Sequence, residues 1–424
     1  MVFLGLLWSS YIPRPANTMH GMSKRACVGM TSSESTGFST GFSTAIPEPF
    51  CLPIDVVDPH RHPALHAVFA HNKQTLLQTS QFVALGGGGM HGVLYIGALM
   101  ALCNGSVATF KSWVADVQGI AGTSAGSIIG FMLACGMDPW QMRSGLLACN
   151  LGRVMDSVAS TSMEDMQKMG ALCSGAAADE ATRDLVLLCA DDAELTFLGM
   201  HRRTRRTFIV CVTNVDTGRT EYWSHWSRPD MPVWFALRCS SSVPVVFNAP
   251  TLDGSAIYDG GVTCNIPCHV FPAARTLTLF SYRECQARGS GMPAIATMGA
   301  LASMATTNAH IGAMRAVPLY ATRSVPCVAP ATAVSRYAYN ATADDVDGLI
   351  RNGFASLHGV LVRNALFAIV IIFTLVGVGA AAVHYGVKCP SRPLPVCHIL
   401  RPRPAPPSGT DAPSKAHEHT YSAH

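Results

Sequence analysis

The chain has 424 residues, of which 49% are hydrophobic and 13% charged, and its formal net charge is +4. This length accommodates one large domain or two ordinary ones with a sizeable core. The charge is small and spread along the chain, which argues against nucleic-acid binding, whereas the apolar excess predicts that part of the chain lies in a membrane.

Residues 1–76 are predicted to form a flexible arm. The stretch from Thr31 to Pro53 is rich in Ser, Thr, Gly and Pro and repeats Gly-Phe-Ser-Thr directly, a composition that buries little apolar surface. The apolar run at Met1–Trp8 lacks a basic region before it, which disfavours a secretory signal peptide. The fifteen cysteines are scattered through candidate helices and strands, which indicates reduced core residues rather than a disulfide framework.

A glycine-rich loop at 86–92 follows a short apolar strand pattern at 82–85 and precedes an apolar helix from about residue 93. Its glycines match the G-x-G-x-x-G fingerprint of dinucleotide-binding proteins. That fingerprint requires an acidic residue at the end of a second strand about twenty positions later, and Asp116 does not end a clear strand. The alternative, which we favour, is an oxyanion loop whose backbone N–H groups stabilise negative charge.

The segment 119–127 has the shape of a nucleophile elbow, in which a strand turns sharply into a helix at a serine. Ser124 lies between Gly122 and Gly126, where a Cβ would collide with the neighbouring strand or helix. The helix that follows, from about 125 to 135, would direct its N-terminal N–H groups at the reacting centre. A serine hydroxyl is a weak nucleophile, so this geometry also requires a base beside it.

Charged and aromatic runs follow the elbow. The carboxylate pairs Asp179-Glu180 and Asp191-Asp192 lie beside apolar residues at helical spacing, which favours solvated helix faces over a metal or acid–base site. The basic hexamer at 201–206 forms either a contact with anionic lipid headgroups or a charged turn. A strand at 208–215 comes next, and aromatic residues at 222, 223 and 226 predict a second strand with its rings in the core.

Four motifs in one order span about half the chain. They are the glycine loop at 86–92, the elbow at 122–126, a serine and proline run at 241–247, and Asp259-Gly-Gly with Asn265-x-Pro267. Together they resemble the patatin-like phospholipase family. The resemblance implies an α/β fold, a three-layer α/β/α sandwich with a mainly parallel central sheet, over residues 77–285.

The resemblance also implies a serine–aspartate dyad that cleaves fatty acyl esters. Ser124 would be the nucleophile, Asp259 the proton acceptor, and the N–H groups of Gly87, Gly88 and Gly89 the oxyanion hole, with no metal or cofactor. A partly desolvated carboxylate within hydrogen-bond reach can accept the serine proton. The remaining motif positions are Gly92, Gly122, Gly126, Gly260 and Gly261. One departure is His91, where the family usually carries Lys or Arg.

Two other functions and a metal site compete with this interpretation. An α/β-hydrolase with a Ser-Asp-His triad would need a later histidine, such as His269 or His310. A membrane-anchored lipid-binding protein could keep the fold without activity. Cys264, Cys268 and His269 have the spacing of half a zinc site, but no matching second pair lies nearby, so no metal is expected.

The C-terminal part is predicted to anchor the domain. Residues 286–364 are expected to form a helical extension and juxtamembrane segment, 365–383 a single transmembrane helix, and 384–424 a disordered Pro-rich tail. The 19 uncharged residues of 365–383 are just long enough to cross a hydrocarbon layer about 30 Å thick. The expected protein is therefore a single-pass, membrane-embedded lipid hydrolase with lipid as its substrate. Basic residues after the span favour a cytoplasmic C-terminus, whereas the lack of a convincing signal peptide favours a cytosolic enzyme domain. The orientation in the membrane therefore stays open.

Overall fold

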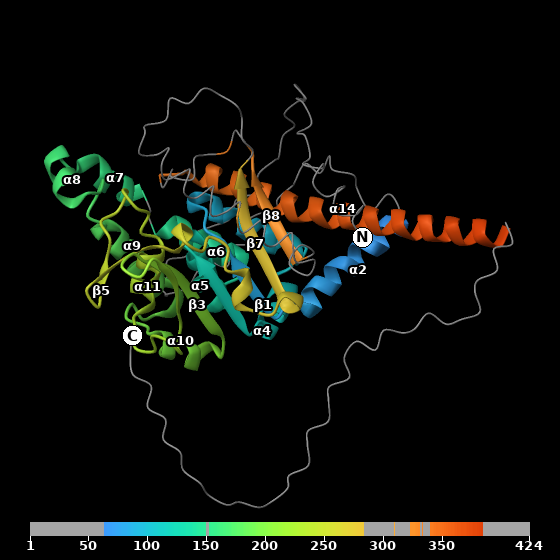
Figure 1. Cartoon of the computed structure of the whole chain (residues 1–424), viewed down its shortest axis with the longest axis horizontal. Helices are drawn as coiled ribbons and strands as arrows, with labels where there is room; N and C mark the ends of the chain where they lie inside the picture. Colours follow the sequence, from blue (N-terminus) through green and yellow to red (C-terminus); the bar gives the residue numbers. More distant parts are fainter. Residues whose placement is uncertain are drawn as a thin grey trace, which may run out of the picture. The chain divides into compact units, whose positions relative to one another are not determined.

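The computed structural model describes residues 63–149, 152–283, 309, 323–330, 333 and 340–384 (Figure 1). Its centre is an eight-stranded sheet with the order β5-β6-β3-β2-β1-β7-β8, in which β4 also pairs with β3. The strands are β1 (Phe82–Leu85), β2 (Gly119–Thr123), β3 (Thr207–Asn214), β4 (Arg219–Trp223), β5 (Thr251–Leu252), β6 (Ser255–Asp259), β7 (Thr276–Arg283) and β8 (Ser324–Ala329). The predicted tail beyond His384 and most of the predicted arm lie outside the described residues.

The sheet is mixed, with a parallel centre. Strands β3, β2, β1, β7 and β8 are parallel neighbours, whereas β4 and β6 run antiparallel to β3 and β5 runs antiparallel to β6. Parallel strands end at the same edge of a sheet, which brings the glycine loop after β1 beside the turn after β2. Because β6 is antiparallel to β3 and pairs Asp259 with Val212, its last residue reaches the sheet beside that turn.

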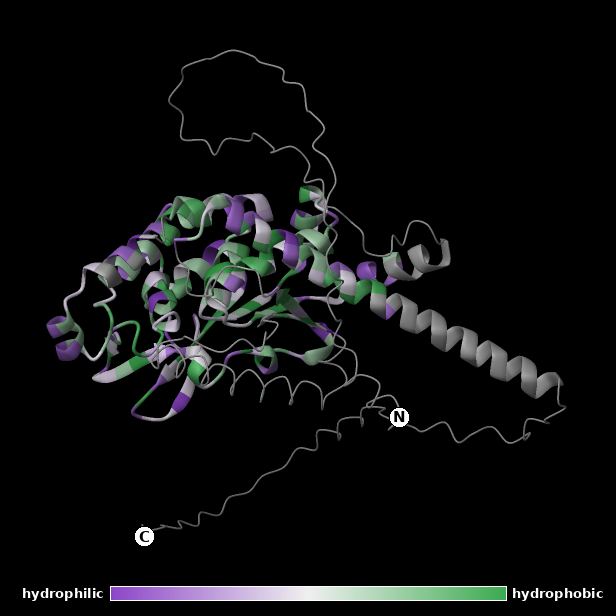
Figure 2. Cartoon of the chain, turned by 90° about the horizontal axis from the view of Figure 1, so that it is seen from above, coloured by the Kyte–Doolittle hydropathy of each residue, from purple (hydrophilic) through white to green (hydrophobic). Residues whose placement is uncertain are grey.

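One face of the sheet is covered by helices. Alternate strand residues such as Val83, Ile120 and Val210 enter the main core. Figure 2 shows that much of the strands and of the helices packed on them is apolar. The helices are α2 (Pro63–Thr79), α3 (Leu94–Leu102), α4 (Val107–Asp116), α5 (Ala125–Ala134), α6 (Pro139–Ala148), α7 (Gly152–Ser160), α8 (Met163–Met169), α9 (Ala176–Ala190), α10 (Phe197–Thr204), α11 (Val233–Ser240) and α14 (Ala343–His384).

The other face differs from the predicted sandwich. In the described part of the chain it is covered by the segment 264–275, which contains short 3-10 turns, instead of a helical layer. Ile266 packs with Ala84 and Phe280, and Phe271 stacks on Phe82 with ring centroids 4.7 Å apart.

Three other expectations are corrected by the structure. Helix α2 begins at Pro63, inside the range predicted as a flexible arm. Strand β8 lies inside the range predicted as a helical extension and pairs with β7 at the sheet edge. Trp226 lies beyond the end of β4 with 71% of its surface exposed, whereas Trp223, on the strand, is buried as predicted.

Helix α14 packs closely against α3. A Cβ at Gly97 would collide with backbone atoms of residues 350 and 354, and a Cβ at Gly353 with the backbone of Leu94, so glycine at both positions allows the helices to approach. The predicted span 365–383 belongs to the second half of α14, and its side chains lie outside the described residues. Within the described part of the chain no single helix is both long and apolar enough to cross a membrane, although the bent pair Gly89–Leu102 and Val107–Asp116 meets the length and composition requirement together.

Candidate active site

Ser124 occupies the turn between β2 and α5, as the elbow motif predicts. Its backbone has φ 52° and ψ −128°, a left-handed conformation that costs a non-glycine residue about 1–3 kcal/mol. The flanking glycines make the turn possible, because a Cβ at Gly122 would lie 2.5 Å from the nitrogen of Ser127 and a Cβ at Gly126 2.5 Å from the oxygen of Gly86. The tight turn holds Ser124 at the start of α5, where it is 8% exposed.

Asp259, the last residue of β6, is buried next to Ser124. Its Oδ1 accepts the N–H of Gly261 at 2.7 Å, and its carboxylate accepts a side-chain hydrogen bond from Ser124. Burial raises the pKa of Asp259 to about 6, and the hydrogen bonds from Ser124 and Gly261 limit that rise. The structure therefore brings together two side chains that are 135 positions apart, and leaves the carboxylate with a proton affinity suited to a base near neutral pH.

The glycine loop lies directly beside Ser124, but its three N–H groups differ. A Cβ at Gly87 would be 3.3 Å from the Cβ of Ser124. Gly87 donates its N–H to the Asn265 carbonyl at 3.0 Å, so this group is already occupied. The N–H groups of Gly88 and Gly89 donate to no protein acceptor among the described residues. Of the three N–H groups predicted as oxyanion donors, those of Gly88 and Gly89 are thus the two that carry no protein acceptor among the described residues.

Other motif glycines serve close packing around this loop. A Cβ at Gly92 would lie 2.7 Å from the Cβ of Ala125, and one at Gly261 3.0 Å from Oδ1 of Asp259. A Cβ at Gly260 would collide with the backbone of Cys211 on β3. His91, in the 3-10 turn Gly89–Val93, is fully buried. Its side chain therefore belongs to the packed interior beneath the loop.

The end of helix α11 and the residues just after it contact both Ser124 and Asp259, through a hydroxyl and a carbonyl group that the sequence analysis did not identify. Ser240 Oγ accepts the N–H of Ser124 at 2.9 Å and donates to the carbonyl of Cys211 at 2.7 Å. The carbonyl of Ser242 accepts the N–H of Asp259 at 2.9 Å. The serine run before Pro244 signals this motif in the sequence, but nothing local indicates which hydroxyl contacts which partner.

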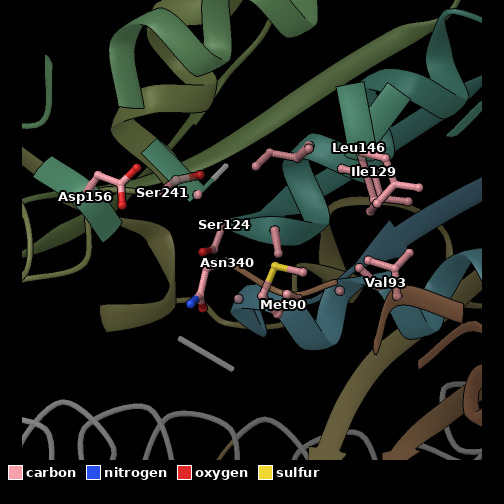
Figure 3. A pocket seen from close by; sticks show the side chains of 16 residues that line it. Met90, Val93, Ser124, Ile129, Leu146, Asp156, Ser241 and Asn340 are labelled. Carbon is pink, nitrogen blue, oxygen red and sulfur yellow. The ribbon is translucent and has the colours of Figure 1, made fainter. Parts of the chain in front are cut away.

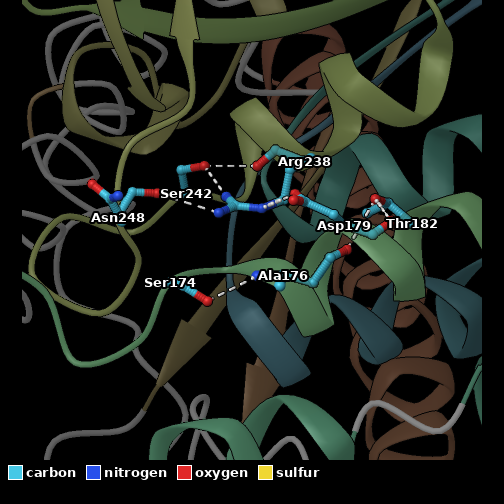
Figure 4. Close-up of polar contacts among 8 residues, drawn as sticks. Ser174, Ala176, Asp179, Thr182, Arg238, Ser242 and Asn248 are labelled. Carbon is cyan, nitrogen blue, oxygen red and sulfur yellow. Dashed lines mark hydrogen bonds and ion pairs between the residues drawn. The ribbon is translucent and has the colours of Figure 1, made fainter. Parts of the chain in front are cut away.

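Arg238 is the second feature that the sequence did not reveal (Figure 4). Its side chain is 2% exposed, and its Nε lies 2.7 Å from Oδ1 of Asp179. Its guanidinium also donates to the carbonyl of Asn248 at 3.2 Å and to Oγ of Ser242. Asp179, predicted to lie on a solvated helix face, is instead half-buried against this arginine. The cluster fixes the segment that carries the Ser242 carbonyl.

A pocket of about 380 Å³ opens at Ser124 (Figure 3). Polar side chains lie on one side of it and apolar ones on the other, with Ser124 between them. Its volume is in the range of small-molecule sites. Its principal side chains are those of Met90, Val93, Ser124, Ile129, Leu146, Leu147, Asp156, Ser241, Asn340 and Val346.

The residues of the competing interpretations lie elsewhere. Nε2 of His269 is 2.8 Å from the hydroxyl of Tyr222, and His310 lies outside the described residues. Among the described residues, no group of three or more His, Cys, Asp or Glu side chains is placed to hold a metal ion. In the basic hexamer, Arg203 pairs with Asp192 and Arg206 donates to the carbonyls of Val114 and Ala134. Those contacts match the charged-turn alternative for the hexamer.

Residues 83–272 match the family model described as patatin-like phospholipase. The chain is 25% identical over 194 residues to a probable lipid hydrolase of Invertebrate iridescent virus 6. The matched region covers 44% of the chain and 62% of that relative. It is also 25% identical to an uncharacterized protein of Acanthamoeba polyphaga mimivirus, over 45% of the chain and 60% of the relative. The chain thus spans about three fifths of the length of these relatives.

Among solved structures, the chain is similar to VipD from Legionella pneumophila, with 16% identity, a TM-score of 0.41 and 67% of each chain covered. The family model covers the glycine loop, the elbow at Ser124 and the Asp259 segment. These three segments also carry the geometry described above. Residues 83–272 therefore carry a patatin-like phospholipase domain, which confirms the resemblance found in the sequence.

Proposed function

We propose that the protein is a lipid acyl hydrolase of the phospholipase A type, with Ser124 as nucleophile and Asp259 as base. The observation that carries the proposal is the side-chain hydrogen bond between Ser124 and a buried carboxylate whose pKa is raised to about 6. An ordinary surface aspartate is too weak a base for this role. The match to the phospholipase family and the name of the viral relative support a lipid ester as substrate.

The reaction would proceed through an acyl-enzyme. Ser124 Oγ attacks the ester carbonyl while its proton passes to Asp259, and the N–H groups of Gly88 and Gly89 stabilise the oxyanion. The carbonyl re-forms as the alcohol leaves with the proton from Asp259. A water molecule then gives a proton to Asp259 and attacks the acyl group, and Ser124 recovers its proton as the fatty acid departs. None of these steps requires a metal or a cofactor.

The pocket supplies the binding surface for the acyl chain. Val93, Ile129 and Leu146 line its apolar side, where a fatty acyl group would leave water. The apolar stretch 365–383 is proposed to anchor the enzyme as a single membrane span. Long-chain lipids have very little free concentration in water, so an enzyme held at a bilayer meets its substrate at high local concentration.

The decisive experiment compares fatty-acid release by the full chain and by its Ser124→Ala variant, using purified protein and mixed phospholipids. We expect the variant to lose about 10³-fold or more in rate and to resist labelling by a fluorophosphonate. Ser112→Ala is the matched control, because this exposed serine on α4 contributes no hydrogen bond to the site. Equal release by the wild type and Ser124→Ala would end the proposal.

A second variant separates the dyad from a histidine triad. His269→Ala removes the described histidine that follows Asp259 most closely, and its ring bonds Tyr222. The dyad mechanism predicts near wild-type release by this variant. A loss as large as that of Ser124→Ala would favour the triad.

A further inference from the structure

The pocket has two chemically different sides, and only one of them is used by an acyl chain. In Figure 3 the side chains of Asp156 and Ser241 lie on the side opposite Ile129 and Val93, with Ser124 between them. An ester held with its carbonyl at Ser124 must extend one arm to each side. The apolar side takes the acyl arm, so the polar side faces the alcohol arm.

We propose that Asp156 and Ser241 form a headgroup subsite, and that Asp156 selects lipids whose headgroup carries an ammonium group over lipids with an anionic headgroup. This inference rests on the proposed function, because it assigns the two arms of the same ester. It adds a substrate class and a residue that determines it.

Ser241 is unusual among the serines of its run. The hydroxyls of Ser240 and Ser242 are both engaged with protein acceptors. Ser241 Oγ is shielded from solvent, lines the pocket and has no hydrogen-bond partner among the described residues. A buried hydroxyl without a partner is unfavourable, and a rotation of the Ser241 side chain would let it bond a ligand oxygen in the pocket.

Asp156, on α7, brings an uncompensated negative charge to the same side. The nearest arginines are paired with other carboxylates, since Arg153, on α7 itself, contacts Asp184 and Arg143, on α6, contacts Asp347. No Lys or Arg of the described residues lies within ion-pair distance of Asp156. A cationic headgroup would therefore find an unpaired partner there, whereas an anionic one would be repelled.

The test uses phosphatidylethanolamine and phosphatidylglycerol with identical acyl chains, each at low mole fraction in neutral detergent micelles. This format keeps the headgroup charge from changing the binding of the enzyme to the surface. We expect the full chain to show a kcat/KM about fivefold higher for phosphatidylethanolamine, the size of effect that a single partly solvated charge pair produces. Asp156→Asn should bring the ratio close to one, and Asp156→Lys should invert it.

The controls distinguish the inference from the proposed function. Asp116→Asn neutralises an exposed carboxylate on α4, outside the pocket, and should leave the ratio unchanged. Ser241→Ala should lower kcat/KM for both lipids alike, by about fivefold. A ratio that stays the same in Asp156→Asn, while Ser124→Ala is inactive, would overturn the headgroup subsite and leave the hydrolase standing. Wild-type release by Ser124→Ala would instead remove the proposed function itself.

Discussion

The two sides of the site are held in place by different kinds of contact. Ser124 sits on a turn that consecutive residues define, with Gly122 and Gly126 letting backbone segments touch. Asp259 depends on distant groups: the Ser242 carbonyl accepts its N–H, and Thr213 Oγ1 donates to its carbonyl at 2.9 Å. The nucleophile side, the turn at Ser124, is thus set mainly by its local backbone with one hydrogen bond to Ser240, whereas the acid side, the surroundings of Asp259, is held by groups of β3 and of the segment after α11.

This difference has a physical consequence for variants. A turn made by close backbone contacts either forms or does not, because displacing packed backbone atoms costs a large free energy. A carboxylate held by hydrogen bonds from other elements can shift by degrees. Substitutions on the acid side should therefore alter the rate and its pH dependence gradually. They test the proposed dyad more sharply than substitutions of the turn glycines, which would abolish the fold of the site.

The largest effect is expected for Asp259→Asn, which removes the base and keeps the shape. We expect kcat to fall about 10³-fold or more, because the amide cannot accept the serine proton. The free energy of unfolding, in contrast, should be higher for the variant than for the wild type at neutral pH. Since burial raises the folded pKa of Asp259 to about 6, the folded state binds its proton more tightly than the unfolded chain, and stability is lost as pH rises from about 4 to about 6.

Above pH 6 the charged carboxylate therefore costs up to about 2–3 kcal/mol, and Asn removes most of that cost. Urea unfolding at pH 7.5 should show a higher midpoint for the variant. Asp230→Asn, at an exposed position, is the control and should change neither rate nor midpoint. An unchanged or lower midpoint for Asp259→Asn would contradict the buried, ionised state of the carboxylate.

Arg238→Met comes next and tests whether distant contacts hold the acid side. The variant loses the bonds to Asn248 and Ser242, and we expect the free energy of unfolding to fall by about 3 kcal/mol. The segment that binds the Asp259 N–H should then loosen, lowering kcat about 30-fold, a loss of about 2 kcal/mol in transition-state stabilisation.

A pH profile separates positioning by Arg238 from simple loss of stability. If Asp259 moves away from Ser124, it loses a hydrogen bond that lowers its pKa, so the acidic limb of kcat/KM should move to higher pH. Arg203→Met is the matched control, because that arginine pairs with Asp192 at the surface and contributes little. A fall in rate without any movement of the acidic limb would assign Arg238 a structural role only.

The wild-type profile itself is the third prediction. Because Asp259 must be ionised to act as base, kcat/KM should fall about tenfold for each pH unit below about 6. The measurement uses a short-chain ester in neutral micelles, so that acidification does not alter a charged lipid surface. A limb near pH 4, the usual range of an aspartate, would mean that the carboxylate is solvated in the active enzyme.

The same contrast explains how far the sequence predicted the molecule. Strand β1, the turn at Ser124 and helix α5 follow from short apolar runs and glycines, and the structure confirms them. Strand β8 was missed because Pro326 breaks its strand pattern, which a sheet tolerates at an edge. Trp226 was assigned to the core because aromatic composition does not reveal where β4 ends.

The contacts of the acid side were beyond local reasoning. Asp179 reads as a solvated residue of α9, and only its meeting with a buried arginine 59 positions later shows otherwise. A lone Arg between Leu237 and Cys239 in an apolar helix was the available signal. Such a residue indicates a buried charge but does not identify its partner, because a partner on another helix is fixed only by the assembled fold.

The smallest effect is expected for Ser240→Ala, which tests whether the two sides are independent. Ser240 Oγ accepts the N–H of Ser124 and donates to the Cys211 carbonyl, so its hydrogen bonds do not involve the Asp259 carboxylate. Its loss should lower kcat about fivefold and leave the acidic limb near pH 6, because the surroundings of the carboxylate do not change. Ser160→Ala, on the exposed end of α7, controls for the loss of a serine hydroxyl. If Ser240→Ala moved the limb as far as Arg238→Met, the turn and the carboxylate would be one coupled unit, and the separation of a local side from a distant side would fail.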